Sequence, residues 1–154
     1  PNRLKAAFKD DMKRLPNLEL EITETSVIED LGAAKPVLAE LRNMGVHIAI
    51  DDFGTGFSSF SYLKDFPADT LKIDQSFVRE IMHSSTDAIQ VRRTIELSKD
   101  LNLVSIAEGV EDKEAAEWLT KQGCDMLQGY WIAKPMPLSE WPDWLRKHDP
   151  RAKA

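Results

Sequence analysis

Short apolar segments alternate with longer amphipathic segments along most of the chain. Five segments have the apolar character of buried strands, at residues 18–22, 46–50, 69–74, 103–109 and 124–130. Helical spacing of apolar residues predicts helices at residues 4–15, 31–44, 58–65, 87–102, 112–123 and 137–149. Apolar strands that alternate with helices in this way predict a parallel sheet covered by helices.

Two architectures share this alternation, an open doubly wound sheet and a (β/α)8 barrel. No GxGxxG follows the first predicted strand, which weakens the dinucleotide-binding form of the open sheet. Nearly every predicted strand ends in a polar residue, and these are Glu21, Asp51, Lys72, Glu108 and Gln128. Parallel strands bring such ends to one edge, and in a barrel they converge on the axis where active sites of that fold lie. The prediction is therefore an α/β fold of the TIM-like (β/α)8 barrel class.

The number of strands is too small for a closed barrel. A barrel of this class has eight strands and roughly 250 residues, whereas this chain has 154 residues and enters on a predicted helix. We expect residues 1–154 to be the C-terminal portion of a single barrel domain that lacks about the first three strands.

The charge and composition exclude several functional classes. The formal net charge of −6 argues against a polymeric nucleic-acid partner, because phosphate-backbone binding needs clustered Lys and Arg. A small anionic ligand remains compatible if a metal ion supplies positive charge locally. The single Cys124 excludes an internal disulfide and a Cys-rich zinc site. With no membrane-length apolar run and no secretory signal, we expect a cytoplasmic location, although a segment outside this chain could tether the parent protein to a membrane.

The segment DDFGTG carries the strongest chemical signal. Asp51 and Asp52 stand side by side at the end of an apolar strand, where like charges repel and a purely structural turn gains little from the pair. A tight polar turn would explain Gly54 and Gly56 but not the adjacent acids. Hard cations such as Mg²⁺ or Mn²⁺ prefer carboxylate oxygens, and two successive acids can each serve one ion of a pair.

The other predicted strand ends also carry candidate site residues. For these residues a purely structural explanation competes with the functional one. Glu21 and Glu24 could equally mark a strand that leaves the core before a capped helix. Lys72 fits badly as an exposed residue of a sheet covered on both faces, and it could orient a water molecule or neutralise a phosphate oxygen. Glu108 is a candidate metal ligand or general base. Gln128 is the weakest of these signals by chemistry alone.

Several motifs in order resemble the later part of EAL domains, which are bacterial phosphodiesterases that linearise cyclic diguanylate. The matching segments are LELEITE, IAIDDFGTGFSS, LKIDQSF, IAEGVE and GCDMLQGYWIAKPMP. They run from about Leu18 to Pro137, which is most of the chain. The resemblance implies a (β/α)8-type barrel that hydrolyses one phosphodiester bond of cyclic di-GMP with two Mg²⁺ or Mn²⁺ ions.

The resemblance also implies residue roles. It makes Glu21, Asp51, Asp52 and Glu108 metal ligands, with Glu108 alternatively a general base. It gives Lys72 the role of holding the attacking water. The same match makes Glu24 the acid that tethers the loop of residues 52–59, and Gln128 the glutamine of the site.

The chain departs from the family pattern before Leu18. The Glu-Ala-Leu motif and a metal-binding Asn should precede that residue, and neither is present. We therefore expect little phosphodiesterase activity from this chain alone and activity from the complete domain. The alternative is a non-catalytic EAL module that binds cyclic di-GMP or a protein partner as a receptor.

The expected partners follow from the same analysis. They are cyclic di-GMP, a second copy of the chain through exposed strand edges, and a sensory or GGDEF-type domain elsewhere in the parent protein. A kinase interpretation of DFG would require a Gly-rich loop, a strand lysine and an HRD-type loop upstream, and these are absent from the sequence.

Overall fold

The computed structural model describes residues 1–8, 12–29, 31–56 and 63–148. Its strands are β1 (Glu19–Thr23), β2 (His47–Phe53), β3 (Thr70–Ile73), β4 (Val104–Ala107) and β5 (Met126–Leu127). Its α-helices are α1 (Asn2–Ala7), α2 (Glu24–Glu29), α3 (Leu31–Asn43), α4 (Gln75–Glu80), α5 (Ser85–Asp100), α6 (Lys113–Gln122) and α7 (Trp141–His148). Three 3-10 helices, η1 (Met12–Asn17), η2 (Leu63–Asp65) and η3 (Leu138–Glu140), complete the described elements.

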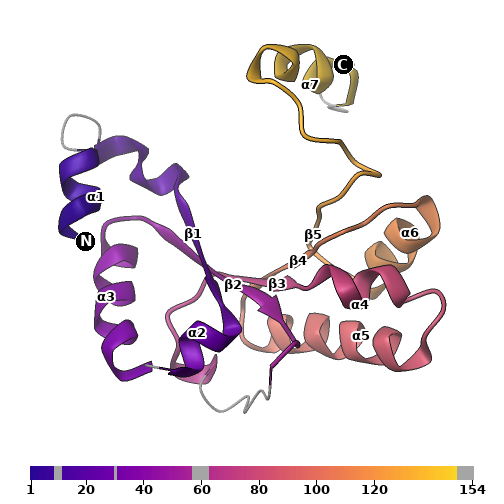
Figure 1. The fold of residues 1–154 in the computed structure, drawn as a ribbon, viewed down its shortest axis with the longest axis horizontal. Coiled ribbons are helices and arrows are strands. Elements are labelled where there is room, and N and C mark those ends of the chain that lie inside the picture. The colour runs from indigo at the N-terminus through magenta and orange to yellow at the C-terminus, as the bar shows by residue number, and fades with distance from the viewer. Residues whose placement is uncertain (9–11, 30, 57–62, 149–154) are drawn as a thin grey trace.

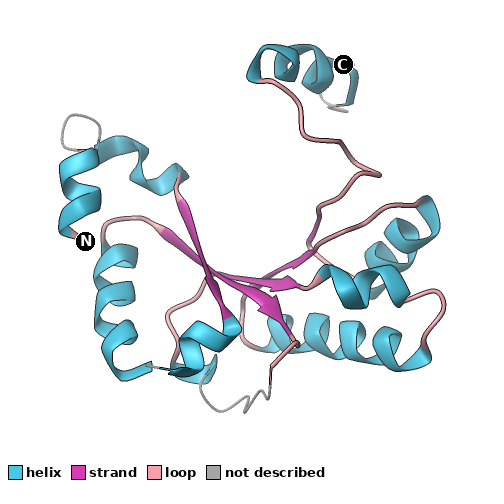
Figure 2. Ribbon diagram, viewed as in Figure 1, coloured by secondary structure: helices cyan, strands magenta, loops and turns pink. Residues whose placement is uncertain are grey.

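The five strands form one parallel sheet in the order β1-β2-β3-β4-β5. Each strand pairs with the next strand along the chain, and α3, α5 and α6 lie around the outside of the sheet (Figure 1; Figure 2). A doubly wound sheet reverses its strand order at a switch point, whereas a barrel does not. The sequential order confirms the barrel class, here as a partial barrel.

The core lies between the central strands and the helices that cover them. Ile50 and Leu71 of neighbouring strands are completely buried, as are Val91 and Ile95 of α5 and Leu119 of α6. Burying an aliphatic side chain of this kind contributes about 1.5–3 kcal/mol through removal of apolar surface from water. The helix faces that carry these residues therefore hold the sheet and fix the direction of its strand ends.

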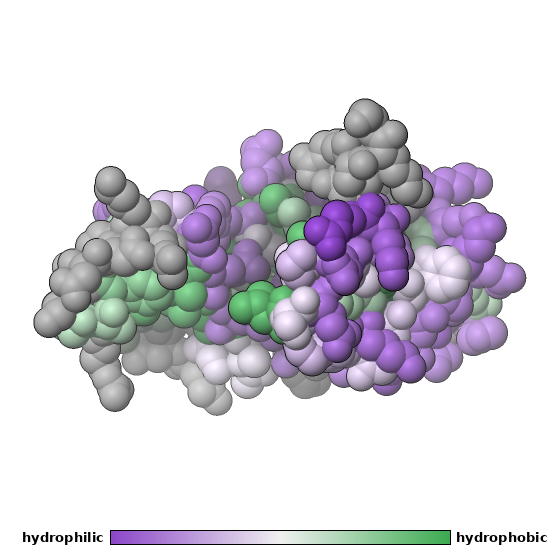
Figure 3. Space-filling view, turned by 90° about the horizontal axis from the view of Figure 1, so that it is seen from above, coloured by the Kyte–Doolittle hydropathy of each residue, from purple (hydrophilic) through white to green (hydrophobic). Residues whose placement is uncertain are grey.

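Within the described part of the chain, β1 and β5 form the two edges of the sheet. The C-terminal segment leaves β5 and carries α7 away from the sheet (Figure 1). Large apolar side chains near this end are half or more exposed, and they include Met126, Tyr130, Trp131, Leu138 and Trp141. Seen from above, green apolar areas lie between purple polar ones (Figure 3), as is expected where the inner side of a barrel is not enclosed.

Most predicted elements are present with shifted ends. The predicted helix at 4–15 is instead α1 followed by η1, and the residues between them lie outside the described part. Of the predicted helix at 58–65 only η2 is described. Sequence periodicity missed α2 and α4, since each has only six residues and shows less than two turns of a repeat. No described helix combines the length and the apolar character that crossing a bilayer requires.

Candidate metal centre

A β-bulge in β2 explains how the side chains of two successive aspartates can face one site. Ile50 pairs with Leu71 and Phe53 with Ile73, so β2 contains one more residue than β3 over this stretch. Adjacent residues of a regular strand point to opposite faces, whereas a bulge redirects a side chain and raises the local twist. Asp52 adopts a left-handed conformation with φ of +54° within this bulge. Asp51 and Asp52 can therefore turn their carboxylates toward the same space.

Lys72 is the buried centre of a charge cluster at the carboxyl ends of four strands. Its side chain is only 4% exposed, and its Nζ lies 2.7 Å from Glu21 Oε1, 3.0 Å from Asp51 Oδ1 and 2.8 Å from Glu108 Oε1. Burial lowers the pKa of Lys72, but its contacts with the carboxylates of Glu108, Glu21 and Asp51 outweigh the effect of burial and raise the pKa above its ordinary value. The lysine therefore carries a positive charge that offsets part of the carboxylate charge.

Asp51, Asp52 and Glu108 form the part of the cluster that fits a cation. One carboxylate oxygen from each lies within 4.8 Å of the others. Asp51 Oδ1 is buried and has no hydrogen-bond partner among the described residues, since its contact with Lys72 Nζ satisfies the distance of an ion pair but not hydrogen-bond geometry. An orphaned buried oxygen beside two more carboxylates is the donor set that hard divalent ions prefer. The residues present fit such an ion.

The negative charge of Asp52 is electrostatically unfavourable in this arrangement. Burial raises the pKa of Asp52, and the charges of Asp51 and Asp74 and a hydrogen bond with Asp74 raise it further, while Lys72 acts in the opposite direction. The sequence predicts a strand that ends at Asp74, but β3 stops at Ile73. Asp74 is instead the N-cap of α4, where its carboxylate accepts hydrogen bonds from the backbone N–H and the hydroxyl of Ser76.

Glu24 and Gln128 take other positions around this centre. Glu24 is completely buried at the start of α2, and its Oε2 accepts a hydrogen bond from the N–H of Gly54 at 2.8 Å. Gln128 follows β5 and lines a hollow of about 260 Å³ together with Glu108 and Arg79. Glu24 thus holds Gly54 of the predicted loop, of which residues 57–59 lie outside the described part, and Gln128 lies on the Glu108 side of the centre.

Two residues of this region were missed by the sequence analysis. Arg79 of α4 forms an ion pair of 2.7 Å with Glu111, which lies in the loop after Glu108. Gln90 of α5 donates a hydrogen bond to the carbonyl of Gly54 at 3.1 Å. Both lie on helices whose polar faces give no signal in sequence that distinguishes a site residue from a solvated one.

The model of the EAL domain family matches residues 1–135. The chain belongs to the EAL domain family. A curated relative, the bifunctional diguanylate cyclase/cyclic di-GMP phosphodiesterase MucR of Pseudomonas aeruginosa, is 47% identical over 124 residues, which is 80% of this chain and 18% of MucR. The chain thus matches less than a fifth of this relative.

Solved EAL structures share the fold. A PaMucR phosphodiesterase in complex with c-di-GMP has a TM-score of 0.87 and 42% identity over 91% of this chain and 57% of that chain. Klebsiella pneumoniae BlrP1 in a manganese/cy-diGMP complex has a TM-score of 0.79 and 35% identity over 87% of this chain and 34% of that chain. These likenesses confirm the EAL resemblance and the partial TIM-like barrel.

Proposed function

We propose that residues 1–154 are the C-terminal portion of an EAL domain which, when complete, hydrolyses cyclic di-GMP to linear pGpG. The observation that carries this proposal is the contact of Lys72 with three carboxylates from β1, β2 and the end of β4. A ring of acids around one buried cation is expensive to assemble and is seldom built for stability alone. The relatives named as cyclic di-GMP phosphodiesterases support the same conclusion.

We assign the metal-ligand role to Glu21, Asp51, Asp52 and Glu108, and the cofactor to Mg²⁺ or Mn²⁺. A divalent cation at such a site supplies a Lewis acid that activates water and offsets phosphate charge. The chain's own residues hold and orient the reacting groups. Lys72 would orient the attacking water and balance negative charge near the phosphate.

Three further roles complete this assignment. Glu108 would act as the general base at this centre, where its Oε1 lies 2.8 Å from Lys72 Nζ. Glu24 holds the loop that follows the aspartates through Gly54. Gln128 would contact the nucleotide from the Glu108 side.

The test compares residues 1–154 with a version extended upstream through the Glu-Ala-Leu segment. Both are incubated with cyclic di-GMP and Mn²⁺, and pGpG is measured by chromatography. The extended protein should hydrolyse the substrate and residues 1–154 should not. An active fragment would contradict the need for the upstream strands. Binding by the extended protein without turnover would replace the enzyme proposal with the receptor alternative.

We propose three further properties of the whole protein. The edges that β1 and β5 form among the described strands favour association with a second copy, which a monomeric mass at high concentration in light scattering would contradict. A GGDEF-type or sensory domain in the parent is supported by the bifunctional name of MucR. A cytoplasmic site of action fits a nucleotide second messenger as substrate.

A further inference from the structure

Gly54, two residues after Asp52, is held by hydrogen bonds at both its N–H and its C=O. The N–H donates to Glu24 Oε2 at 2.8 Å, and the C=O accepts from Gln90 Nε2 at 3.1 Å. A Cβ at Gly54 would lie 2.7 Å from Gln90 Nε2 and 3.2 Å from the ring of Phe77, so α4 also packs against this residue. Three helices from separate parts of the chain therefore fix one residue of the loop.

The hydrogen bonds at Gly54 act on Asp52 through a short turn. The N–H and the hydroxyl of Thr55 both donate to the carbonyl of Asp52, at 3.3 and 2.8 Å. This closes the turn from Asp52 to Thr55, so that the turn moves as one unit with Gly54 inside it. A left-handed non-glycine residue costs roughly 1–2 kcal/mol and persists only where its surroundings hold it. The hydrogen bonds to Gly54 supply that constraint.

We propose that Gln90 is a positioning residue for the metal centre. By donating to Gly54 from α5, it keeps the turn in the conformation that directs the Asp52 carboxylate toward Asp51 and Glu108. This inference rests on the divalent-cation site proposed above and deepens it. It adds a contact from α5 to the contact that Glu24 makes from α2.

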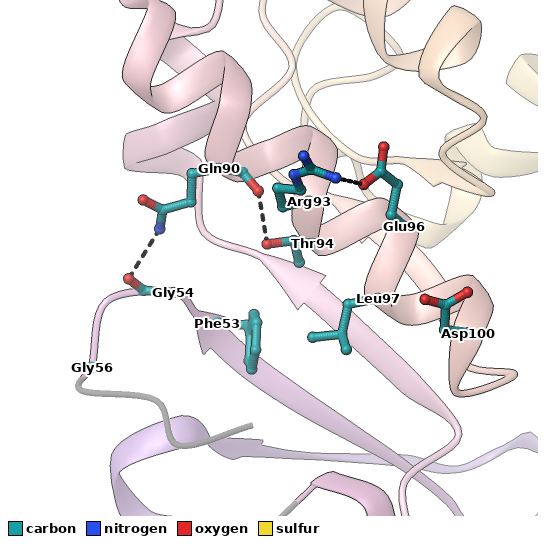
Figure 4. A pocket seen from close by; sticks show the side chains of 9 residues that line it. All are labelled: Phe53, Gly54, Gly56, Gln90, Arg93, Thr94, Glu96, Leu97 and Asp100. Carbon is teal, nitrogen blue, oxygen red and sulfur yellow. Dashed lines mark hydrogen bonds and ion pairs between the residues drawn. The ribbon is translucent and has the colours of Figure 1, made fainter. Parts of the chain in front are cut away.

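The surroundings of Gln90 indicate that its amide group serves this contact rather than general packing. Figure 4 shows the side chain reaching from α5 to Gly54 along the margin of a hollow of about 650 Å³, which Phe53 and Leu97 also line. The backbone carbonyl of Gln90 accepts a separate hydrogen bond from Thr94 within the helix. A residue beside a hollow can be replaced by one of equal length without overpacking, so variants at Gln90 should fold.

The experiment uses three substitutions of Gln90 and one control in the 154-residue chain. Gln90→Met keeps the length and removes the donor, and Gln90→Glu keeps the shape but places an acceptor against the Gly54 carbonyl. Gln90→Lys restores a donor. The control is Arg93→Met, because Arg93 lines the same hollow but forms its ion pair with Glu96 of its own helix.

The first readout is amide hydrogen exchange at Gly54 and Thr55, measured by NMR without metal. Gln90→Met and Gln90→Glu should exchange about fivefold faster at these two amides, the effect of losing one hydrogen bond of about 1 kcal/mol. Gln90→Lys and Arg93→Met should match the wild type. A general loss of protection in all variants, or no change at Gly54 and Thr55 in Gln90→Met and Gln90→Glu, would overturn the proposal.

The second readout is Mn²⁺ affinity by calorimetry. Residues that orient metal ligands typically change affinity about 10–100-fold when replaced, so Gln90→Met and Gln90→Glu should bind about tenfold more weakly and Gln90→Lys within about twofold of the wild type. Unchanged affinity in Gln90→Met would overturn the proposal. If the wild-type chain binds no Mn²⁺, the cation site itself fails in this chain, and the exchange of Gly54 and Thr55 then decides the role of Gln90.

Discussion

The ammonium nitrogen of Lys72 lies 3.0 Å from Asp51 Oδ1, a buried oxygen with no hydrogen-bond partner among the described residues. The same nitrogen contacts Glu21 and Glu108 at shorter distances. This single positive charge therefore holds three acids together. The buried ammonium of Lys72 thus lies beside the site where the proposed enzyme would bind divalent ions.

Replacing Lys72 by Met should destabilise the metal-free chain strongly. The variant leaves three carboxylates without their shared cation, and removing one partner of a buried ion pair costs about 3–5 kcal/mol. Because Glu21 is half exposed, we expect the lower end, about 3 kcal/mol. Urea unfolding followed by circular dichroism measures the change.

Lys113→Met is the matched control for this substitution. Lys113 pairs with Glu117 on the surface of α6, where both side chains are more than two-thirds exposed. Such pairs contribute about 0–1 kcal/mol, so this variant should unfold close to the wild-type urea concentration. Equal urea midpoints for Lys72→Met and the wild type would show that Lys72 does not hold the acids together.

Replacing Asp52 by Asn should stabilise the metal-free chain slightly at neutral pH. The raised pKa of Asp52, caused by burial and by Asp51 and Asp74, means that its ionised form is unfavourable in the fold. The folded state then binds protons more tightly than the unfolded state, so stability falls as pH rises through this pKa. We expect a gain of about 0.5 kcal/mol, the size of a like-charge contact at a surface.

Two comparisons make this test specific. The gain of Asp52→Asn should disappear below about pH 4, where the wild-type carboxyl is protonated as well. Asp52→Ala should gain less, because Asn tolerates the left-handed conformation and Ala does not. A gain that is independent of pH would rule out charge as its cause.

The convergence of polar strand ends could be predicted from sequence, but the geometry of the two aspartates could not. Apolar runs locate the strands, and parallel pairing then requires Glu21, Asp51, Lys72 and Glu108 to share an edge. The bulge at Asp52 depends on contacts that α2 and α5 make with Gly54. Those contacts are non-local, so no pattern around residues 51–54 reveals them.

Short elements and their caps were also beyond the sequence pattern. The apolar–polar alternation after Lys72 extends the predicted strand to Asp74. In the structure Asp74 caps α4, a helix of six residues. Asp is a preferred N-cap residue, but a helix of six residues shows too short a repeat for the sequence pattern to reveal α4.

Gly109→Ala should destabilise the chain more than Gly123→Ala. Both glycines have left-handed backbones, with φ of +68° and +79°, so Ala costs about 1 kcal/mol at either position. A Cβ at Gly109 would also lie 2.6 Å from Gln75 Cβ, whereas at Gly123 it meets only the mobile end of Lys99. Overpacking of this kind adds about 1–3 kcal/mol.

The steric part of this difference can be isolated with a second substitution. Gln75→Gly removes the Cβ that Gly109→Ala would meet, so the double variant should cost less than the sum of the two single variants in urea unfolding. Gly109→Ala should also weaken Mn²⁺ binding because it displaces the adjacent Glu108. Additive costs, or equal costs at Gly109 and Gly123, would contradict the predicted clash.

Asp125→Ala should lower stability at neutral pH and much less in acid. The Asp125 carboxylate accepts hydrogen bonds from the hydroxyl and the N–H of Ser105, and these two contacts lower its pKa. A lowered pKa in the fold gives stability that is present above the unfolded value and is lost as pH falls through the folded one. We expect a cost of about 1 kcal/mol at pH 7 after allowing for solvent exposure.

The pH profile of this cost identifies its origin. Urea midpoints of the wild type and Asp125→Ala should approach each other as pH falls below about 4, because the wild type then loses its ionised acceptor. Asp100→Ala removes an exposed acid at the end of α5. Its urea midpoint should change with pH as the wild-type midpoint does over that range. If the difference in urea midpoint between Asp125→Ala and the wild type stays constant down to pH 3, the charge of the Asp125 carboxylate does not hold β5 against β4. The joining of these two strands would then depend on backbone pairing and packing alone.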